Sequence, residues 1–143
     1  VDPRPLRGNF SSGGGGSQAY RELSGWTHAL KIDSGKRLQA EGWLPANFCG
    51  FQGHFPGFPV LPAVVMVLWA RVLGERLTET PLRLSELRRA KFASLAGPQM
   101  RLGLNLKIKK TGDTGIAGVL TISHGSLRVA KIDLKWKPVK GEG

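Results

Sequence analysis

The sequence predicts an α+β fold in which one long helix lies against a curved antiparallel sheet. One segment of helical character, residues 63–77, stands in mid-chain; a strand-like hairpin precedes it, and several alternating apolar segments follow it. Strands grouped on either side of one helix are typical of α+β proteins. We expect one domain, residues 26–140, after a flexible Gly/Ser-rich tail, residues 1–25.

Composition fits a single globular domain of 143 residues, with 41% hydrophobic and 22% charged residues. The single cysteine, Cys49, excludes an intrachain disulfide framework and a cysteine-based zinc site. The longest uncharged apolar run, residues 58–70, contains two prolines and is shorter than the roughly 20 residues of a membrane span. We therefore expect a cytoplasmic protein with no membrane span, no metal and no cofactor.

The elements around the helix follow from periodicity and turn residues. Residues 26–32 and 37–43 predict a hairpin, because Asp33, Ser34 and Gly35 between them form a turn signal. Pro62 sits where a helix can begin, since proline is tolerated in the first turn. After the helix, strands are predicted at residues 84–92, 101–109, 116–123 and 127–136.

The predicted helix is apolar nearly all round for its first two turns, so we expect it to be covered on every side. Its β-branched residues also suit a strand, but the preceding proline and the polar last turn favour a helix. Met66 and Trp69 are predicted to lie in the core or to line a tunnel. Dimerisation would supply part of the cover that such a helix needs.

His54 is the histidine most suited to chemistry. It stands in a Gly- and Pro-rich segment, residues 53–62, which stiffens the backbone immediately before the helix. The residues alone leave open a catalytic imidazole and a histidine that only bonds a loop carbonyl. A Cys49–His54 nucleophile pair is a further alternative. His28 and His124 have no acidic or thiol neighbours at ligand spacing and are interpreted as surface residues.

The pattern Gly-His-Phe-Pro-Gly-x-Pro-x-x-Pro before an apolar helix resembles the signature of the FabA/FabZ-type 3-hydroxyacyl-acyl carrier protein dehydratases, which have a hot-dog fold. The similarity also covers residues 35–37 and 89–92 and extends over residues 26–138. Within the helix, residues 68–70 are most similar to the thioester dehydratases of aryl-polyene-type pigment clusters.

The resemblance implies a site for dehydrating a 3-hydroxyacyl thioester. His54 would be the base that removes a proton next to the thioester carbonyl. The backbone N–H of Ala63, with Gly57, would polarise that carbonyl at the positive end of the helix dipole. Phe55 and Pro62, together with Leu68, would line the substrate tunnel.

Leu68 departs from the family pattern, because it stands where related enzymes carry the Glu or Asp that protonates the leaving hydroxyl. Glu75 lies about 10 Å further along the helix axis and is not expected to substitute. One hypothesis is therefore a weak or partner-dependent dehydratase. The alternatives are a non-catalytic hot-dog subunit that binds an acyl thioester or scaffolds a complex, and a hot-dog thioesterase.

The formal net charge is +11, and the basic excess lies in the second half of the chain. Acyl carrier proteins are acidic, so the resemblance implies that Arg89 and Lys91 help to dock the carrier. Nucleic acid is not expected as a partner, because no recognised binding motif is present. The resemblance also implies a site shared across a homodimer or a heterodimer with a related hot-dog subunit.

Overall fold

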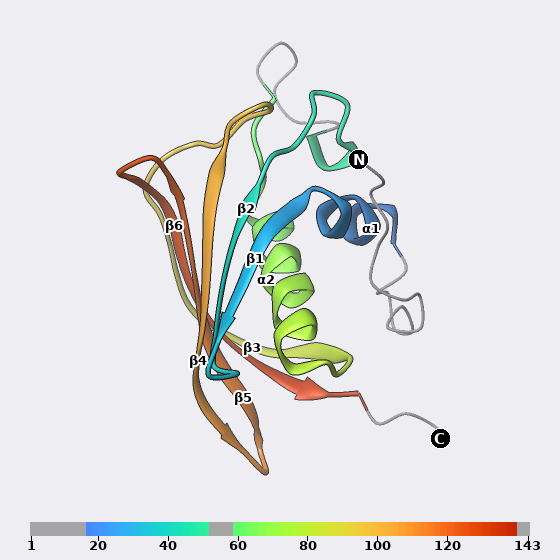
Figure 1. Ribbon diagram of the computed structural model, residues 1–143, viewed down its shortest axis with the longest axis vertical. Coiled ribbons are helices and arrows are strands. Elements are labelled where there is room, and N and C mark those ends of the chain that lie inside the picture. The colour runs from blue at the N-terminus through green and yellow to red at the C-terminus, as the bar shows by residue number, and fades with distance from the viewer. Residues whose placement is uncertain (1–16, 52–58, 140–143) are drawn as a thin grey trace.

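The computed structural model describes residues 17–51 and 59–139. Their centre is a six-stranded antiparallel sheet with the strand order β1-β2-β4-β5-β6-β3, and α2 packs lengthwise against one face of it (Figure 1). This arrangement confirms the predicted α+β fold with one helix against a curved sheet. No helix in the described ranges is long and apolar enough to cross a membrane.

The predicted strands and the central helix are all present, with ends that differ by a few residues. The central helix begins directly after Pro62, as expected, and ends at a Glu79 in the left-handed conformation, whose N–H donates to the carbonyl of Glu75. The elements are α1 (Gln18–Gly25), β1 (Thr27–Asp33), β2 (Arg37–Gly42), η2 (Cys49–Phe51), α2 (Ala63–Thr78), β3 (Leu82–Phe92), β4 (Leu102–Gly112), β5 (Gly115–His124) and β6 (Leu127–Pro138).

The first helix corrects the expectation that ordered structure begins near Trp26. Ser17 caps α1 by accepting a hydrogen bond from the N–H of Tyr20, and Tyr20 and Leu23 are buried against the rest of the fold. Apolar side chains three residues apart give this short helix a face that packs on α2. The remaining predicted tail, residues 1–16, lies outside the described residues.

Two tryptophans fit against glycines where the helix meets the sheet. The ring of Trp69 lies over Gly42, where an added Cβ would fall 2.3 Å from a ring carbon. The same indole N–H donates to the Thr27 hydroxyl at 2.9 Å. Trp136 lies between Gly74 of α2 and Gly118 of β5, and an added Cβ at Gly74 would approach it to 3.2 Å. Close approach therefore fixes α2 along the sheet.

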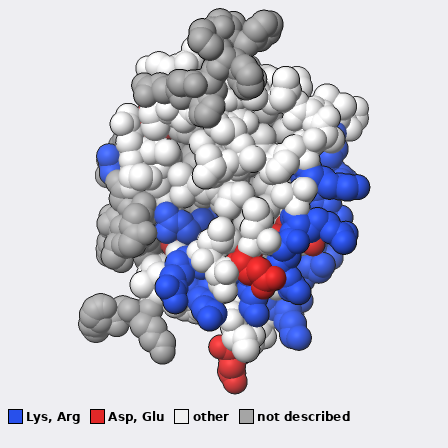
Figure 2. Space-filling view, turned by 180° about the vertical axis from the view of Figure 1, so that it is seen from behind, with Lys and Arg blue, Asp and Glu red and all other residues white. Residues whose placement is uncertain are grey.

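The two faces of the sheet differ in chemistry. Along β4, β5 and β6 the side chains alternate between buried apolar residues, which face α2, and more exposed residues on the opposite side. We call the latter side the outer face. Lys and Arg side chains gather over it, visible on the right of the space-filling view in Figure 2. The core thus lies wholly between the inner face and the helices.

Candidate active site

The start of α2 offers free backbone donors. Pro62 is the N-cap residue, and its carbonyl accepts from the N–H groups of Val65 and Met66, each at 3.1 Å. The N–H groups of Ala63 and Val64 find no acceptor among residues 17–51 and 59–139, as is usual in a first helical turn. Both residues are exposed, so the start of α2, with the positive end of the helix dipole, lies at the surface of the described chain.

Three expected site residues, His54, Phe55 and Gly57, lie outside the described residues. The chain on either side of them is well anchored. Before them, the N–H of Phe51 donates to the Phe48 carbonyl at 3.1 Å, and after them the N–H of Leu61 donates to the Ala96 carbonyl at 2.8 Å. The predicted motif therefore connects two packed parts of the fold and leads directly into the start of α2.

Leu68 lies one turn after Val64 on the same side of α2, away from the strands. Its side chain is half-buried and packs on the edge of the core, whereas Val64 is 72% exposed. No carboxylate belongs to this turn, because Glu75 is the only acidic residue of α2. The position at which the resemblance implies a proton donor therefore holds an aliphatic side chain.

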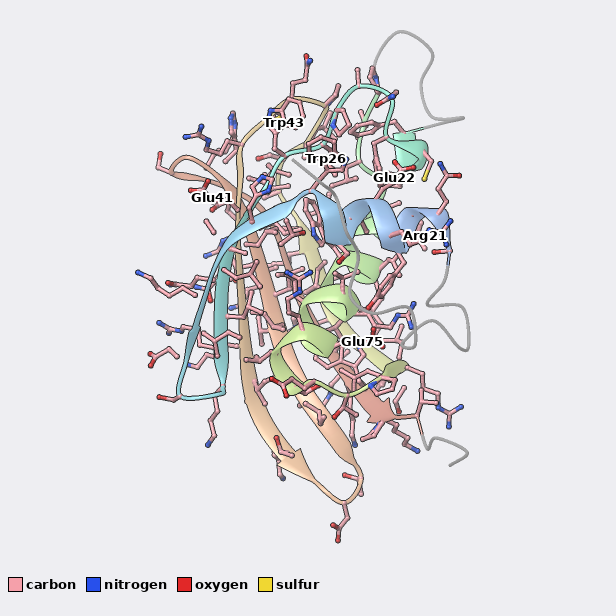
Figure 3. All side chains as sticks on the ribbon, turned by 45° about the vertical axis from the view of Figure 1, so that its right-hand side comes forward. Arg21, Glu22, Trp26, Glu41, Trp43 and Glu75 are labelled. Atoms are coloured by element: carbon pink, nitrogen blue, oxygen red, sulfur yellow. The ribbon has the colours of Figure 1, made fainter. Side chains whose placement is uncertain are left out.

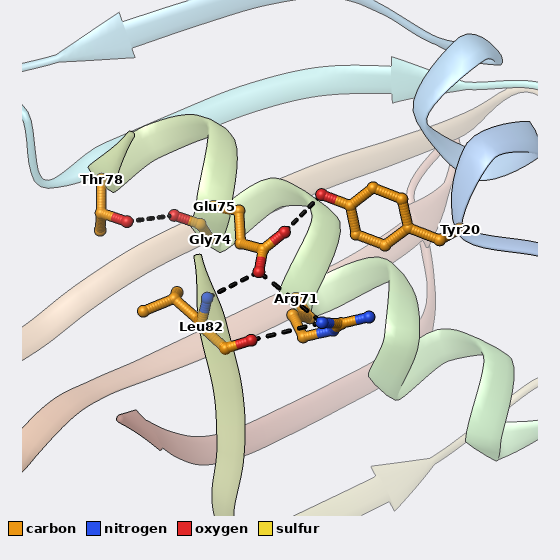
Figure 4. A network of polar contacts seen from close by, with 6 residues as sticks. All are labelled: Tyr20, Arg71, Gly74, Glu75, Thr78 and Leu82. Carbon is orange, nitrogen blue, oxygen red and sulfur yellow. Dashed lines mark hydrogen bonds and ion pairs between the residues drawn. The ribbon is translucent and has the colours of Figure 1, made fainter. Parts of the chain in front are cut away.

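The carboxylate of Glu75 is bound by neighbouring groups of the same chain. It is fully buried, and its carboxylate accepts hydrogen bonds from the Tyr20 hydroxyl and, at 2.6 Å, from the N–H of Leu82 (Figure 4). The guanidinium of Arg71 lies 3.7 Å away and also donates to the Leu82 carbonyl. Burial raises the pKa of Glu75, although the Leu82 N–H, Tyr20 and Arg71 oppose the shift. Because Glu75 is fully buried and bonded to groups of its own chain, it is not available as the acid that the resemblance implies.

Two residues of α1, Tyr20 and Glu22, make hydrogen bonds that were not predicted from the sequence. Burial is the main cause that raises the pKa of the Tyr20 hydroxyl, and its hydrogen bond to Glu75 adds to the shift. Glu22 accepts a hydrogen bond from the N–H of Cys49 at 3.2 Å, so α1 holds the start of η2 (Figure 3). Helix α1 thus links α2 to the chain that precedes the His54 motif.

The remaining candidates separate into core and surface. Met66 and Trp69 are buried, as predicted for core residues. Burial, followed by the Glu22 carboxylate, raises the pKa of the Cys49 thiol, which disfavours the thiolate that a Cys–His nucleophile pair requires. His28 and His124 are exposed, and no cluster of metal-binding side chains occurs within the described part of the chain.

Arg89 and Lys91 lie on β3, and both are exposed on the outer face. In the pairing of β3 with β6, Arg89 is opposite Asp133 and Lys91 is opposite Lys131. The chain continues from β3 to Ala96, which bonds Leu61 just before α2. These two cations are therefore near the C-terminal end of β3, which is the end closest to the start of α2 and is called the site end. They lie on the side of the sheet that faces away from α2.

The comparisons with known proteins agree with this architecture. A family model described as ApeI-like, ApeI dehydratase, matches residues 31–123, more than half of the chain. The 3-hydroxyacyl-[acyl-carrier-protein] dehydratase FabZ of Haemophilus influenzae is 33% identical over 104 residues, which cover 66% of this chain and 70% of the relative. FabZ of Oenococcus oeni is 31% identical over 104 residues, or 67% and 75% of the two chains.

Solved structures share the fold at lower identity. The dehydratase heterocomplex ApeI:P from Xenorhabdus doucetiae superposes with a TM-score of 0.69 at 17% identity, covering 78% of this chain and 96% of that one. The E. coli PaaI protein superposes with a TM-score of 0.59 at 11% identity, covering 76% and 80%. The sheet, the central helix and these matches together show that this hot-dog chain belongs to the ApeI-like dehydratase family.

Proposed function

We propose that this chain is a subunit of a 3-hydroxyacyl-[acyl carrier protein] dehydratase that contributes the base and the carbonyl-binding donors of a site, but not its acid. The observation that carries the proposal is the start of α2. The free N–H groups of Ala63 and Val64 follow the His54 motif directly, whereas Leu68 replaces the carboxylate. The FabZ relatives support the substrate class.

In the proposed reaction, His54 takes a proton from the carbon next to the thioester carbonyl. The N–H of Ala63, with the backbone of Gly57, stabilises the negative charge that develops on the carbonyl oxygen. The electron pair of the broken C–H bond forms the new double bond, and the C–O bond at carbon 3 breaks. The leaving hydroxyl takes a proton and departs as water, which yields the trans-2-enoyl thioester. Leu68 cannot supply that proton.

The apolar surface at the start of α2 supports the proposal that a second subunit binds there. Val64 is largely exposed, and half-buried Val67 and Leu68 continue the same surface. Strand β3 is an edge strand with free pairing groups and exposed Leu84 and Leu87. A related hot-dog subunit that carries a helix carboxylate would cover this surface and complete the site. The solved ApeI:P structure is itself described as a heterocomplex.

Substrate delivery would use an acidic acyl carrier protein. Arg89 and Lys91 are exposed cations near the site end of β3, as carrier docking requires. Pro62 and Leu68, with Phe55, would line the tunnel for the acyl chain. The product class places the protein in fatty-acid or polyene-type synthesis.

A non-catalytic subunit that binds an acyl thioester or scaffolds a complex is the second candidate. Leu68 is the observation that favours it, because loss of a general acid costs about 10²–10⁴-fold in rate. No observation favours a thioesterase.

Dehydration of a 3-hydroxyacyl thioester by the Leu68→Glu variant separates these candidates. We expect the wild-type chain to be slow alone and the variant to be about 10²–10⁴-fold faster. Leu68→Gln is the matched control, because glutamine is similar to glutamate in size and polarity but has no ionisable proton. This variant should stay slow. An inactive Leu68→Glu variant, together with an inactive mixture of the wild-type chain and a related subunit, would leave the non-catalytic candidate.

A further inference from the structure

Strand β3 is a strongly basic edge of the sheet. It is the last strand in the order β1-β2-β4-β5-β6-β3, and β6 is its only neighbour among the described strands. The backbone groups on its other side are therefore free to pair with another chain. The strand contains four cations and one carboxylate, all exposed: Arg83, Arg88, Arg89, Lys91 and Glu86.

The carboxylates of β3 and β6 lie in the middle of this edge and already have basic neighbours. Glu86 is 3.8 Å from Arg88 within the same strand, and it is paired in register with Lys135 of β6. Asp133 of β6 is opposite Arg89. In the middle of β3 the opposite charges therefore balance within the chain itself, and neither carboxylate is left over for a cation of another subunit.

The two ends of β3 have no such balance. Arg83, near the start of the strand, is opposite Lys137 of β6, and Lys91, near its end, is opposite Lys131. No ion pair within 4.0 Å in residues 17–51 and 59–139 involves Arg83 or Lys91. Like charges directly opposite each other on neighbouring strands are unfavourable. The basic excess of the edge is therefore concentrated at its two ends.

A second copy of this chain would add to that excess. Two copies that pair edge to edge about a two-fold axis, with their inner faces on the same side, have antiparallel β3 strands. The start of one β3 then lies beside the end of the other, so Arg83 of each copy approaches Lys91 of the other copy. By symmetry this like-charge contact occurs twice, and each contact opposes the pairing.

We infer that the free edge of β3 selects a subunit whose own edge strand is acidic, and that it disfavours a second copy of this chain. That a second subunit binds rests on the proposed function, whereas the charge of its edge strand is inferred from the side chains of β3 and β6. An acidic side chain beside Arg83 replaces a repulsive contact with an attractive one. The edge thus favours a partner of a different sequence, which is also what a site without its own acid requires.

Apolar side chains of the same strand provide affinity but not this selectivity. Leu84, Leu87 and Phe92 are paired in register with buried residues of β6, so they belong to the inner face, yet they remain 43–49% exposed. Burying them is favourable against any apolar surface, whether it belongs to a second copy or to a related subunit. The charges at the ends of β3 are therefore what distinguishes one partner from the other.

The other edge of the sheet has a different character. Strand β1 contains one cation, Lys31, and one carboxylate, Asp33, so it has no charge excess. Its pairing with β2 shifts register between His28 and Lys31, where Ala29 has a φ of 55°, and such a bulge weakens an edge as a template for pairing. At about 4.8 Å per strand, β1 is also about 24 Å from β3, which makes it a suitable place for a control substitution.

Self-association of the full chain, measured by sedimentation equilibrium at low ionic strength, tests the inference. Arg83→Glu places a carboxylate beside Lys91 at both ends of a two-copy pairing, so we expect it to tighten self-association about tenfold. Lys31→Glu is the matched control, because it makes the same change in charge on the other edge strand, and it should associate like the wild type. Raised salt should strengthen self-association of the wild type and weaken that of Arg83→Glu, since it screens repulsion in the first and attraction in the second.

A mixing experiment supplies an acidic edge strand directly. The double variant Arg83→Glu with Lys91→Glu has carboxylates at both ends of β3, so two copies of it repel each other as two wild-type copies do. Mixed with the wild-type chain, it should form a complex about tenfold tighter than either chain forms alone. The double variant Lys31→Glu with Lys36→Glu, mixed with the wild type in the same way, should give no such gain.

Three outcomes would overturn the inference: equal self-association of Arg83→Glu and Lys31→Glu, a mixture that associates no more tightly than its components, or no association in any sample. These measurements do not involve dehydration, so they are distinct from the test of the proposed function. An active Leu68→Glu variant with an edge that is insensitive to charge would count against the inference alone. An inactive Leu68→Glu variant whose association shows the expected charge dependence would instead count against the proposed function.

Discussion

The two halves of α2 differ in how completely their own chain covers them. In the second half, Val72, Leu73 and Glu75 are fully buried, and every polar atom of the Glu75 carboxylate has an internal partner. In the first half, Ala63 and Val64 are exposed and Leu68 is only half-buried. The C-terminal half of α2 is thus buried by its own chain, whereas its N-terminal end lies at a partly exposed apolar surface.

The difference indicates which end of the helix has exposed groups that are available for function. The Glu75 carboxylate in the second half is costly to bury, and the chain satisfies it with Tyr20, Arg71 and the N–H of Leu82. The first half combines free N–H groups with exposed aliphatic side chains, which suits a bound thioester and a second subunit. The described chain alone does not cover this helix on every side, and cover of the remaining side by a second subunit stays a prediction.

The largest expected effect is on stability, in the buried C-terminal half of α2. Glu75→Ala leaves the Tyr20 hydroxyl and the Leu82 N–H buried without their acceptor, and it removes the partner of Arg71. We expect a loss of about 3 kcal/mol in the free energy of unfolding, measured by urea denaturation.

The control for this variant is Glu86→Ala, which removes a carboxylate that is half-exposed and paired with Arg88 at 3.8 Å. It should change the free energy of unfolding by less than about 0.5 kcal/mol. Equal effects of the two variants would show that the buried network does not stabilise α2 as the structure indicates.

The pH dependence of stability is a smaller effect at the same end. Burial raises the pKa of Glu75 above its unfolded value, so between these two pH values the folded chain binds more protons than the unfolded chain. The contribution of Glu75 to stability is therefore largest below its unfolded pKa and is lost as the pH rises through its folded pKa. Relative to Glu75→Gln, the wild type should lose stability over that window in urea titrations, and a constant difference would contradict the assignment.

The smallest effect on stability is expected at the exposed start of α2. Val64→Lys places a charge on a side chain that already faces solvent, so the free energy of unfolding should change by less than about 0.5 kcal/mol. Association with a related subunit should weaken strongly, as judged by light scattering, because a lysine would be buried against an apolar surface. Unchanged association would show that this surface is not the interface, and Lys36→Ala in the β1–β2 turn is a neutral control.

Periodicity and turn residues were sufficient to predict the strands and α2, because each is long enough to show its pattern locally. They did not predict α1, which has eight residues and follows a Gly/Ser-rich run. The buried network was also beyond the sequence, because Tyr20 and Glu75 are 55 residues apart and only the fold brings them together.

For the site, the sequence could show that an acid is missing at Leu68, but the exposed surface around it comes from the packing of α2. The roles of His54, Phe55 and Gly57 stay predictions. The clustering of cations on the outer face depends on strand register, which places Arg37 and Lys107 beside each other although they are far apart in the chain.

Subunit mixing is the most direct test that this chain holds the base and a second subunit the acid. A related family member that keeps its helix carboxylate, with its own motif histidine replaced by alanine, should be inactive alone. Mixed with this chain, it should dehydrate a 3-hydroxyacyl thioester, and His54→Ala in this chain should abolish that activity. Activity that survives His54→Ala, or a mixed complex that forms but stays inactive, would contradict the account.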